Sequence, residues 1–249
     1  MPDSILYVRG LSKSFGALRA CDGIDFDVKE GETHAVIGPN GAGKTTFISQ
    51  LAGNLRPDAG SVRFAGSDIT TLSAPKRARM GLARSFQITS IYPEFSALDN
   101  VALAVQAHSG HSFRFWRTTR GDPALTGPAE RVLDEVGLQQ RKNILAANLS
   151  HGEQRQLEVA MALATEPRLL LLDEPMAGMG TEESQRMIAL LSRLKQRKTI
   201  ILVEHDMDAV FRLADRISVL VYGRVIATDS PERIKMNEEV RRAYLGEEV

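Results

Sequence analysis

The chain has 249 residues, of which 43% are hydrophobic and 25% charged, and its 31 basic residues balance its 31 acidic residues. This composition is typical of a globular protein with a substantial core and excludes collagen-like, coiled-coil and intrinsically disordered chains. A formal net charge of zero gives no support to nucleic-acid binding through the overall field of the protein.

The single cysteine and the N-terminal residues bear on the compartment. Cys21 alone cannot form an internal disulfide or a structural zinc site, which predicts a reducing environment and a small core residue. The first residues contain no basic segment followed by an apolar stretch, and no run of about eighteen apolar residues occurs. We therefore expect neither a signal peptide nor a membrane-spanning helix.

The predicted strands are of two kinds. Residues 24–28 alternate strictly between apolar and polar, and residues 62–64 are similar, which indicates antiparallel strands with one wet face. The apolar runs at 35–37, 169–172 and 200–203 do not alternate, which predicts strands covered on both faces, as in parallel sheets. Between the last two runs, a helix is predicted from apolar residues at helical spacing: Met187, Leu190, Leu191 and Leu194. Strand, helix and strand then form a parallel crossover.

The middle of the chain differs from both ends, because strand signals vanish between about residues 97 and 149. Residues 131–136 predict an amphipathic helix that ends at Gly137. Residues 108–128 are rich in Gly, Ser, Thr and Pro and are expected to form a loop-like insert. A helical insertion within an α/β core is the simplest account.

A glycine-rich loop lies between the strand predicted at 35–37 and a helix-compatible run at 46–52. It matches the phosphate-binding pattern G-x-x-x-x-G-K-[ST] through Gly38, Pro39, Asn40, Gly41, Ala42, Gly43, Lys44 and Thr45. Lys44 would contact the β- and γ-phosphates of a nucleotide, and Thr45 would hold Mg²⁺. A purely structural glycine-rich turn is the alternative, but the strand before the loop and the helix after it favour nucleotide binding.

Three polar residues follow the other two buried strands. Asp173 and Glu174 come directly after the first of these strands, and His205 shortly after the second. Acids that leave a buried strand are costly unless they meet a cation or hydrogen-bond donors. Asp173 would coordinate Mg²⁺, Glu174 would be the general base for the attacking water, and His205 would donate to the γ-phosphate. Open parallel sheets bind ligands at the carboxyl ends of their strands, so we expect these residues to converge with Lys44.

For Asp173 and Glu174 the alternative is a solvated acidic turn, and for His205 it is a structural role.

A further segment, Leu149-Ser150-His151-Gly152-Glu153-Gln154-Arg155, precedes a helical run at 156–165. Ser150 and Glu153 have the spacing of a capping box, which is a structural role. A helix start with Ser and Gly at its tip is also an anion site, although these residues alone do not say whose phosphate it would hold.

Taken in order, these motifs resemble those of the ATP-binding subunits of ABC transporters over essentially the full length of the chain. Residues 38–46, which include Thr46, resemble the Walker A loop, residues 169–174 the Walker B strand, and residues 149–154 the LSGGQ signature. Several ordered motifs at the family's spacing are far more specific than any one of them.

Three single residues extend the resemblance. Gln87, in the segment Ala83-Arg84-Ser85-Phe86-Gln87, is similar to the Q-loop glutamine, which implies a catalytic role and a place among the Mg²⁺ ligands with Thr45 and Asp173. His205 is similar to the switch histidine, and Phe15 matches the aromatic residue that stacks on adenine. The implied cofactors are ATP and Mg²⁺.

The resemblance also implies a fold. It is the ABC ATPase fold: an α/β P-loop NTPase core with a mostly parallel sheet, an N-terminal antiparallel β subdomain and an inserted α-helical subdomain. Residues 1–249 would form a single ABC ATP-binding domain. Residues 1–87 and 156–249 would be the nucleotide-binding core with the antiparallel β subdomain, and residues 88–155 the helical subdomain with the signature motif.

The family's partners follow from the same resemblance. A second ABC ATPase subunit would form a head-to-tail homo- or heterodimer, in which Ser150 and Gly152 contact the ATP of the partner subunit. ATP binding would close the dimer and hydrolysis would open it, driving alternating access in two transmembrane permease subunits. A periplasmic or extracellular solute-binding protein would act indirectly, and no nucleic acid is expected. The protein would lie peripherally on the cytoplasmic face of the inner (plasma) membrane.

Residues 83–87, 204–207 and 242–247 are similar to one subfamily, that of branched-chain (hydrophobic) amino acid uptake. This predicts Mg²⁺-dependent ATP hydrolysis coupled to import of branched-chain or related amino acids. Related systems for urea or amide uptake or for lipopolysaccharide export are alternatives. A soluble ABC ATPase acting on DNA or ribosomes is disfavoured by the single cassette and the short insert, and a P-loop kinase leaves the signature and His205 unexplained.

Two residues depart from the family's pattern. His151 stands where the first signature glycine usually lies, a place where the branched-chain subfamily tolerates bulky residues. Gly180 occupies the D-loop position usually held by Asp. Loss of that carboxylate leaves the coupling between the two ATP sites open and suggests a pair with a different ATPase subunit.

The remaining candidates lie in the insert and at the C-terminus. His108 and His111 lack a third ligand and are expected to be solvated. Residues 113–117 mix aromatic residues with arginines but have too few charges for DNA binding. They are expected to pack on the helical subdomain, with a contact to the membrane subunit as the alternative. A last helix is predicted at 232–244, either for docking or as a solvated face.

Overall fold

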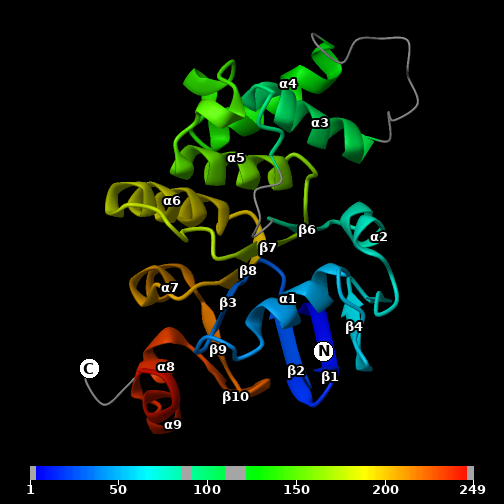
Figure 1. The fold of residues 1–249 in the computed structure, drawn as a ribbon, viewed down its shortest axis with the longest axis vertical. Helices are drawn as coiled ribbons and strands as arrows, with labels where there is room; N and C mark the ends of the chain where they lie inside the picture. Colours follow the sequence, from blue (N-terminus) through cyan, green and yellow to red (C-terminus); the bar gives the residue numbers. More distant parts are fainter. Residues whose placement is uncertain (1–3, 86–90, 110–121, 246–249) are drawn as a thin grey trace.

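The computed structural model describes residues 4–85, 91–109 and 122–245, and two sheets organise them (Figure 1). A four-stranded antiparallel sheet has the order β2-β1-β4-β5, and a six-stranded sheet has the order β10-β9-β3-β8-β7-β6. Neighbours in the six-stranded sheet pair in parallel, except for the antiparallel pair β9 and β10. The strands are β1 (Ser4–Phe15), β2 (Leu18–Lys29), β3 (Thr33–Ile37), β4 (Ala59–Phe64), β5 (Ser67–Asp68), β6 (Leu82–Arg84), β7 (Leu169–Asp173), β8 (Thr199–Val203), β9 (Arg216–Val221) and β10 (Arg224–Asp229).

Helices surround the parallel strands and form one end of the molecule (Figure 1). Within the described residues they are α1 (Lys44–Ala52), α2 (Ala74–Arg79), α3 (Ala97–Ser109), α4 (Pro123–Glu135), α5 (His151–Leu163), α6 (Thr181–Leu194), α7 (Met207–Leu213), α8 (Pro231–Met236) and α9 (Glu238–Val240). Short 3-10 turns lie at Gln139–Arg141 and Ala146–Asn148, and a π turn at Arg241–Leu245. Among the described helices, none is long and apolar enough to cross a membrane.

The apolar runs form strands that are buried on both faces, as predicted. Side chains of a strand alternate between its two faces. In β7, Leu169 and Leu171 therefore pack with α1 and the antiparallel sheet, whereas Leu170 and Leu172 pack with the helices on the other side. This places α1 between the two sheets. The ring centre of Phe47 lies 5.1 Å from that of Phe26 in β2, in an edge-to-face arrangement. The helix that follows the phosphate loop is thus fixed from both sides.

The predicted crossover and the antiparallel strands are confirmed. Residues 24–28 lie in β2 and residues 62–64 in β4, both antiparallel to β1. The helix between β7 and β8 is α6, and its apolar stripe is buried. Helices α3, α4 and α5 pack against one another in the core that also contains this stripe. The α/β class, with one antiparallel and one mostly parallel sheet, is therefore correct.

Two expectations were wrong. Residues 123–128 belong to α4 rather than to a loop, because Asp122 caps the helix by accepting from Ala124 N and Pro123 occupies its first turn. The single helix predicted at 232–244 is divided. Asn237 lies in an extended conformation and its side chain accepts from two N–H groups of α9, so it ends α8 and starts a new helix.

Candidate functional site

The glycine-rich loop joins β3 to α1 and is enclosed by backbone. A Cβ atom at Gly38 would lie 2.0 Å from the carbonyl oxygen of Leu220, and one at Gly43 would lie 2.1 Å from that of Ala20. Gly43 is also the N-cap of α1 and has a φ of 103°, a conformation that favours glycine. The sequence therefore needs glycine at both positions for the loop to pass between β9 and β2.

Lys44, the first residue of α1, is buried inside this loop with 7% of its surface exposed. Its Nζ donates to the carbonyl oxygens of Gly38 (2.6 Å) and Pro39 (3.0 Å). Burial lowers the pKa of the ammonium, whereas the charges of Glu174 and Asp173 act in the opposite direction. The loop thus holds a buried cation at the N-terminal end of a helix, which is the electrostatic arrangement that binds phosphate.

Two acids lie at the carboxyl end of β7. Asp173 is buried, and its Oδ2 accepts from the Arg84 guanidinium of β6 at 2.8 Å. Its Oδ1 is buried and has no hydrogen-bond partner among the described residues. Glu174 follows in the left-handed region (φ 50°), half-buried, with its N–H donating to Val203 O of β8 at 2.8 Å.

The orphaned Asp173 oxygen gives a test of whether the residues fit Mg²⁺. A buried carboxylate oxygen without a donor is costly unless it meets a cation. Carboxylate and hydroxyl oxygens are ligands that Mg²⁺ accepts, and the hydroxyl-bearing side chain of Thr45 is exposed in the first turn of α1. The residues present therefore fit the ion.

His205 follows β8 with its side chain 60% exposed. Its Nδ1 lies 3.7 Å from Oε2 of Glu204, which is itself buried. Because β3, β8 and β7 are adjacent and parallel in the sheet, their carboxyl ends bring Lys44, the two acids and His205 to one edge. The predicted convergence is present.

The segment that resembles the ABC signature begins α5 and contains the predicted capping box. Ser150 Oγ accepts from Glu153 N at 3.2 Å, and the Glu153 carboxylate accepts from Ser150 N at 2.9 Å. A second carboxylate reaches the same tip from α6: Glu183 Oε1 accepts from Ser150 Oγ at 3.0 Å and from Gly152 N at 3.3 Å. The side chain of His151 contacts a different group: its Nε2 lies 3.1 Å from Ala177 O. The donors of this helix start are therefore occupied by a carboxylate of the same chain.

The other predicted residues vary in how far the structure places them. Phe15, at the end of β1, is half-exposed, and Lys13 Nζ lies 5.8 Å from its ring centre. Gly180 is the N-cap of α6 and offers no side chain to the first turn. Gln87, His111 and residues 113–117 lie outside the described residues.

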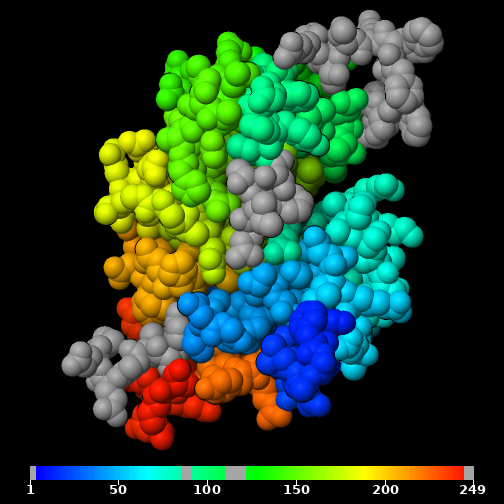
Figure 2. Space-filling model, viewed as in Figure 1, coloured from blue at the N-terminus to red at the C-terminus, as the bar shows by residue number. Residues whose placement is uncertain are grey.

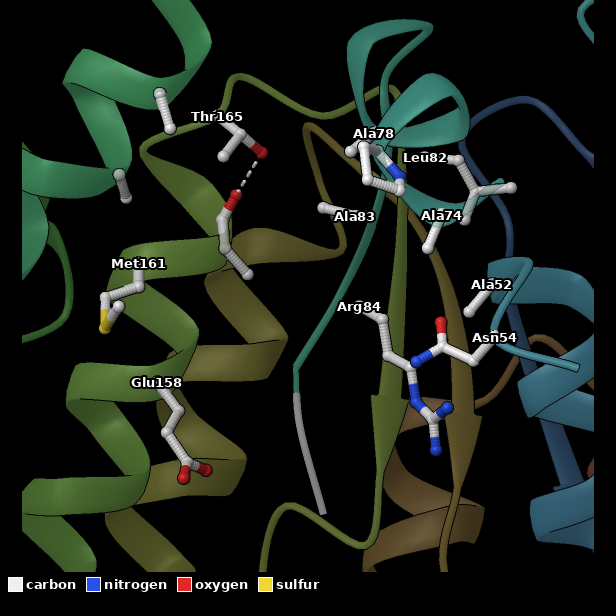
Figure 3. Close-up of a pocket in the computed structure, with 14 residues that line it drawn as sticks. Ala52, Asn54, Ala74, Ala78, Leu82, Ala83, Arg84, Glu158, Met161 and Thr165 are labelled. Atoms are coloured by element: carbon white, nitrogen blue, oxygen red, sulfur yellow. Dashed lines mark hydrogen bonds between the residues drawn. The ribbon is translucent and has the colours of Figure 1, made fainter. Parts of the chain in front are cut away.

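An apolar groove of about 360 Å³ lies next to β6, between α2 and the helices α3 and α5 (Figure 3). The space-filling view shows a hollow on this flank between α2 and α3 (Figure 2). Small side chains line much of it: Ala52, Ala74, Ala78, Ala83, Ala104, Ala107 and Ala162. Arg84 extends from β6 into its lining and also donates to Ser49 Oγ of α1 at 3.2 Å and to Asp173. One side chain thus connects the groove to the acid of β7.

Sequence reasoning did not single out Arg84, Glu183 or Glu204. The contacts of Arg84 and Glu183 join residues far apart in the chain, which no local pattern reveals. Glu204 could have been found, because it is an acid that directly follows a buried strand, the same signal that identified Asp173 and Glu174.

Comparisons with known proteins agree with this geometry. The sequence model of the ABC transporter family matches residues 21–177, and that of the branched-chain amino acid ATP-binding cassette transporter matches residues 224–249. The high-affinity branched-chain amino acid transport ATP-binding protein BraF of Pseudomonas aeruginosa is 38% identical, over 99% of this chain and 100% of its own. The high-affinity branched-chain amino acid transport ATP-binding protein LivG of Escherichia coli is 35% identical, also over 99% of this chain and 100% of its own.

Solved structures show the same fold. A nucleotide-free ATP-binding cassette from an ABC transporter superposes with a TM-score of 0.86 at 26% identity and covers 98% of this chain and 100% of its own. The ADP conformation of MJ1267, an ATP-binding cassette of an ABC transporter, has a TM-score of 0.86 at 27% identity, with 98% and 99% covered. With the phosphate loop, the two acids and the histidine at one sheet edge, this chain belongs to the ABC transporter family of ATP-binding cassettes and is an ABC-type ATPase.

Proposed function

We propose that this protein is the ATP-hydrolysing subunit of an importer for branched-chain or related amino acids. The similarity to BraF and LivG extends over the whole chain, and the C-terminal residues match the branched-chain cassette model. The observation that carries the proposal is the meeting of Lys44, Asp173, Glu174 and His205 at the carboxyl ends of three adjacent strands.

In this proposal the loop of Lys44 binds the polyphosphate of ATP, with its ammonium exchanging the carbonyls of Gly38 and Pro39 for phosphate oxygens. Residues 38–46 surround the phosphates, and the exposed ring of Phe15 stacks on adenine. Thr45, Asp173 and Gln87 would hold Mg²⁺, which neutralises charge that develops on the phosphate oxygens.

Hydrolysis requires a base beside the attacking water. Glu174 takes the proton from this water, and its backbone bond to Val203 keeps it at the edge of the sheet. His205 donates to the γ-phosphate and orders the water, and Gln87 assists at the same place. The exposure of His205 leaves its ring free to approach a bound nucleotide.

The proposal includes assembly with other chains. A second ABC ATPase subunit, identical or different, would bring its ATP to Ser150 and Gly152 at the start of α5. Two permease subunits would contain the translocation path and dock beside the site, and the groove that contains Arg84 offers them an apolar surface of small residues. The subunit would then lie peripherally on the cytoplasmic face of the membrane, with residues 88–155 as its helical subdomain.

Substitution of the base tests the enzymatic part. Glu174→Gln should lower the rate of Mg²⁺-dependent phosphate release from ATP by about 100-fold or more, since proton transfer alone contributes that much. Fluorescent-nucleotide binding should be retained, because the phosphate loop is untouched. Glu130→Gln, which removes a carboxylate of α4 paired with Lys142, is the matched control and should hydrolyse ATP at the parental rate.

Two results would contradict the proposal. Hydrolysis by Glu174→Gln at the parental rate would remove the base assignment. Co-purification from native membranes with permease subunits is expected, and recovery of soluble nucleoprotein partners alone would contradict the transport function.

A further inference from the structure

Two loops at the carboxyl ends of β7 and β8 meet at one buried carboxylate, that of Glu204. The first loop follows β7 and contains Glu174, and the second follows β8 and contains His205. Glu204 is the first residue after β8, and only 1% of its surface is exposed. Its side chain turns away from solvent at a place where the neighbouring His205 side chain turns toward it.

The two carboxylate oxygens bind different loops. Oε1 accepts from the N–H of Met176, two residues after Glu174, at 2.9 Å. Oε2 accepts from the N–H of His205 at 3.0 Å and lies 3.5 Å from that of Asp206. The carboxylate therefore bridges the backbone of its own loop to that of Met176, which lies 28 residues before Glu204 in the chain.

Burying the Glu204 carboxylate has a desolvation cost, which suggests that the bridge has a functional role. Burial raises the pKa of the Glu204 carboxyl, and the three N–H groups act against this shift. A buried carboxylate is tolerated when several donors point at it, and its loss leaves those donors unpaired. An apolar residue would pack in the same place without fixing either loop.

A backbone hydrogen bond between the same two segments makes the arrangement more rigid. Glu174 N donates to Val203 O, so the residue before Glu204 holds the start of the first loop while Glu204 holds its continuation at Met176. The base and the histidine are thus attached to the same pair of residues at the end of β8. Their relative position depends on this attachment.

We propose that Glu204 is a positioning residue for ATP hydrolysis, which fixes the loop of Glu174 relative to the loop of His205. The inference rests on the proposed roles of these two residues. Glu204 touches neither nucleotide nor water in this scheme. It acts on the rate of the chemical step, which depends strongly on the placement of catalytic groups, and leaves nucleotide affinity to the phosphate loop.

Glu204→Gln tests the proposal, because the amide keeps the size of the side chain but can accept at one end only. We expect kcat for ATP to fall by about tenfold or more while KM and the Kd for nucleotide stay within about twofold. Hydrogen exchange should accelerate at the amides of Met176 and His205 together. Glu204→Asp, which is charged but one methylene shorter, should show the same split with a smaller loss of kcat.

Glu32→Gln is the matched control. Glu32 is a partly buried carboxylate that directly precedes β3, at the end of the strand opposite the phosphate loop. It accepts from Lys29 N at 2.7 Å and pairs with Arg216 at 2.8 Å. Its loss should lower stability without changing kcat. Should Glu204→Gln fail to fold, Glu204→Asp carries the test through the same kcat and KM measurements.

The outcomes separate this inference from the proposed function. Parental kcat in Glu204→Gln or, where only that variant folds, in Glu204→Asp would overturn it, provided that Glu174→Gln is inactive. A parallel loss of kcat and nucleotide affinity would also overturn it, because that pattern indicates general disruption of the site. Full activity in Glu174→Gln would instead contradict the assigned base.

Discussion

The phosphate loop at the start of α1 and the segment Ser150–Gly152 at the start of α5, here called the tip of α5, both present N–H or ammonium donors that suit an anion. Their surroundings fix them in different ways. In the phosphate loop, the obstacle to an added methyl group at Gly43 is the backbone of β2. At the tip of α5, a Cβ on Gly152 would lie 2.7 Å from Cδ of Glu183, which is a side chain. Strand backbone cannot move without breaking its sheet, whereas a side chain can change rotamer.

The difference extends to the protein groups that bond to Lys44 in the loop and to Ser150 and Gly152 at the start of α5. The buried Lys44 ammonium is bonded to carbonyls of its own loop. The donors of Ser150 and Gly152 are bonded to a carboxylate that comes from another helix and is half-buried. In the proposed dimer, the half of the ATP site formed by the phosphate loop would therefore be preformed. The half formed by Ser150 and Gly152 would have to exchange the Glu183 carboxylate for the phosphate of a partner subunit's ATP.

Gly43→Ala should have the largest effect, because it tests the preformed half. The methyl group would lie 2.1 Å from Ala20 O and the residue would keep a φ of 103°. Steric overlap and backbone strain together should lower the free energy of unfolding by about 3 kcal/mol. Displacement of the loop should weaken ATP binding by about 100-fold, measured with a fluorescent nucleotide.

Gly41→Ala is the control in the same loop. Its φ is also positive, at 79°, but no atom lies within 4 Å of the added Cβ. It should cost only the strain, about 1 kcal/mol in a denaturant titration without nucleotide. Equal destabilisation by the two variants would show that the contact with β2 does not matter.

Glu183→Gln tests the exchangeable half and should have an intermediate effect. The γ-phosphate of the partner subunit's ATP would need the donors that Glu183 now occupies, and like charges repel. Removal of the charge should strengthen ATP-dependent dimerisation by about three- to tenfold, a modest gain because the carboxylate is partly exposed to solvent. Analytical ultracentrifugation in the Glu174→Gln background would measure it without turnover.

Glu182→Gln provides the matched control. It removes the same charge from the same first turn of α6, but Glu182 is exposed and pairs with Arg186 rather than with Ser150. It should leave the dimerisation constant within about twofold, since surface pairs of this kind contribute little. If both variants strengthened the dimer equally, net charge and not occupancy of the tip would be the cause.

In both halves the local parts were predictable from sequence and the long-range contacts were not, for a physical reason. The strand, loop and helix around Lys44 are consecutive, so one local pattern specified them. The same was true of the capping box at Ser150. The contact between Gly43 and Ala20 joins the phosphate loop to β2, and the contact of Glu183 with Ser150 joins α6 to α5, so neither leaves a local signal.

The wrong expectations have a similar origin. Pro128 and its neighbours suggested a loop, but the cap at Asp122 and the proline after it had already started a helix that tolerates Pro128. Charges of both signs at 232–244 were compatible with one helix, and the decisive feature was the side chain of Asn237 binding the backbone. Local competition between a side chain and a helix is decided by geometry that composition does not contain.

Gly180→Ser should have the smallest effect and sharpens the view of the exchangeable half. Gly180 is extended (φ −72°, ψ 165°), and no atom lies within 4 Å of an added Cβ, so any residue fits. Glu183 Oε2 already accepts from Gly180 N at 3.4 Å, and a serine hydroxyl would complete the reciprocal capping box. We expect the free energy of unfolding, measured in a urea titration, to rise by about 0.3 kcal/mol.

Gly180→Ala separates the cap from the added side chain. Alanine is a poorer N-cap than glycine, so this variant should be slightly less stable than the parent, and nucleotide affinity should be unchanged in both. A better cap would also hold the Glu183 side chain in the first turn of α6, where it bonds to Ser150, and would so oppose its release from Ser150. Gly180→Ser should therefore weaken ATP-dependent dimerisation by no more than about twofold, the opposite direction from Glu183→Gln. A stronger dimer in Gly180→Ser would mean that the cap and the occupancy of the tip are independent.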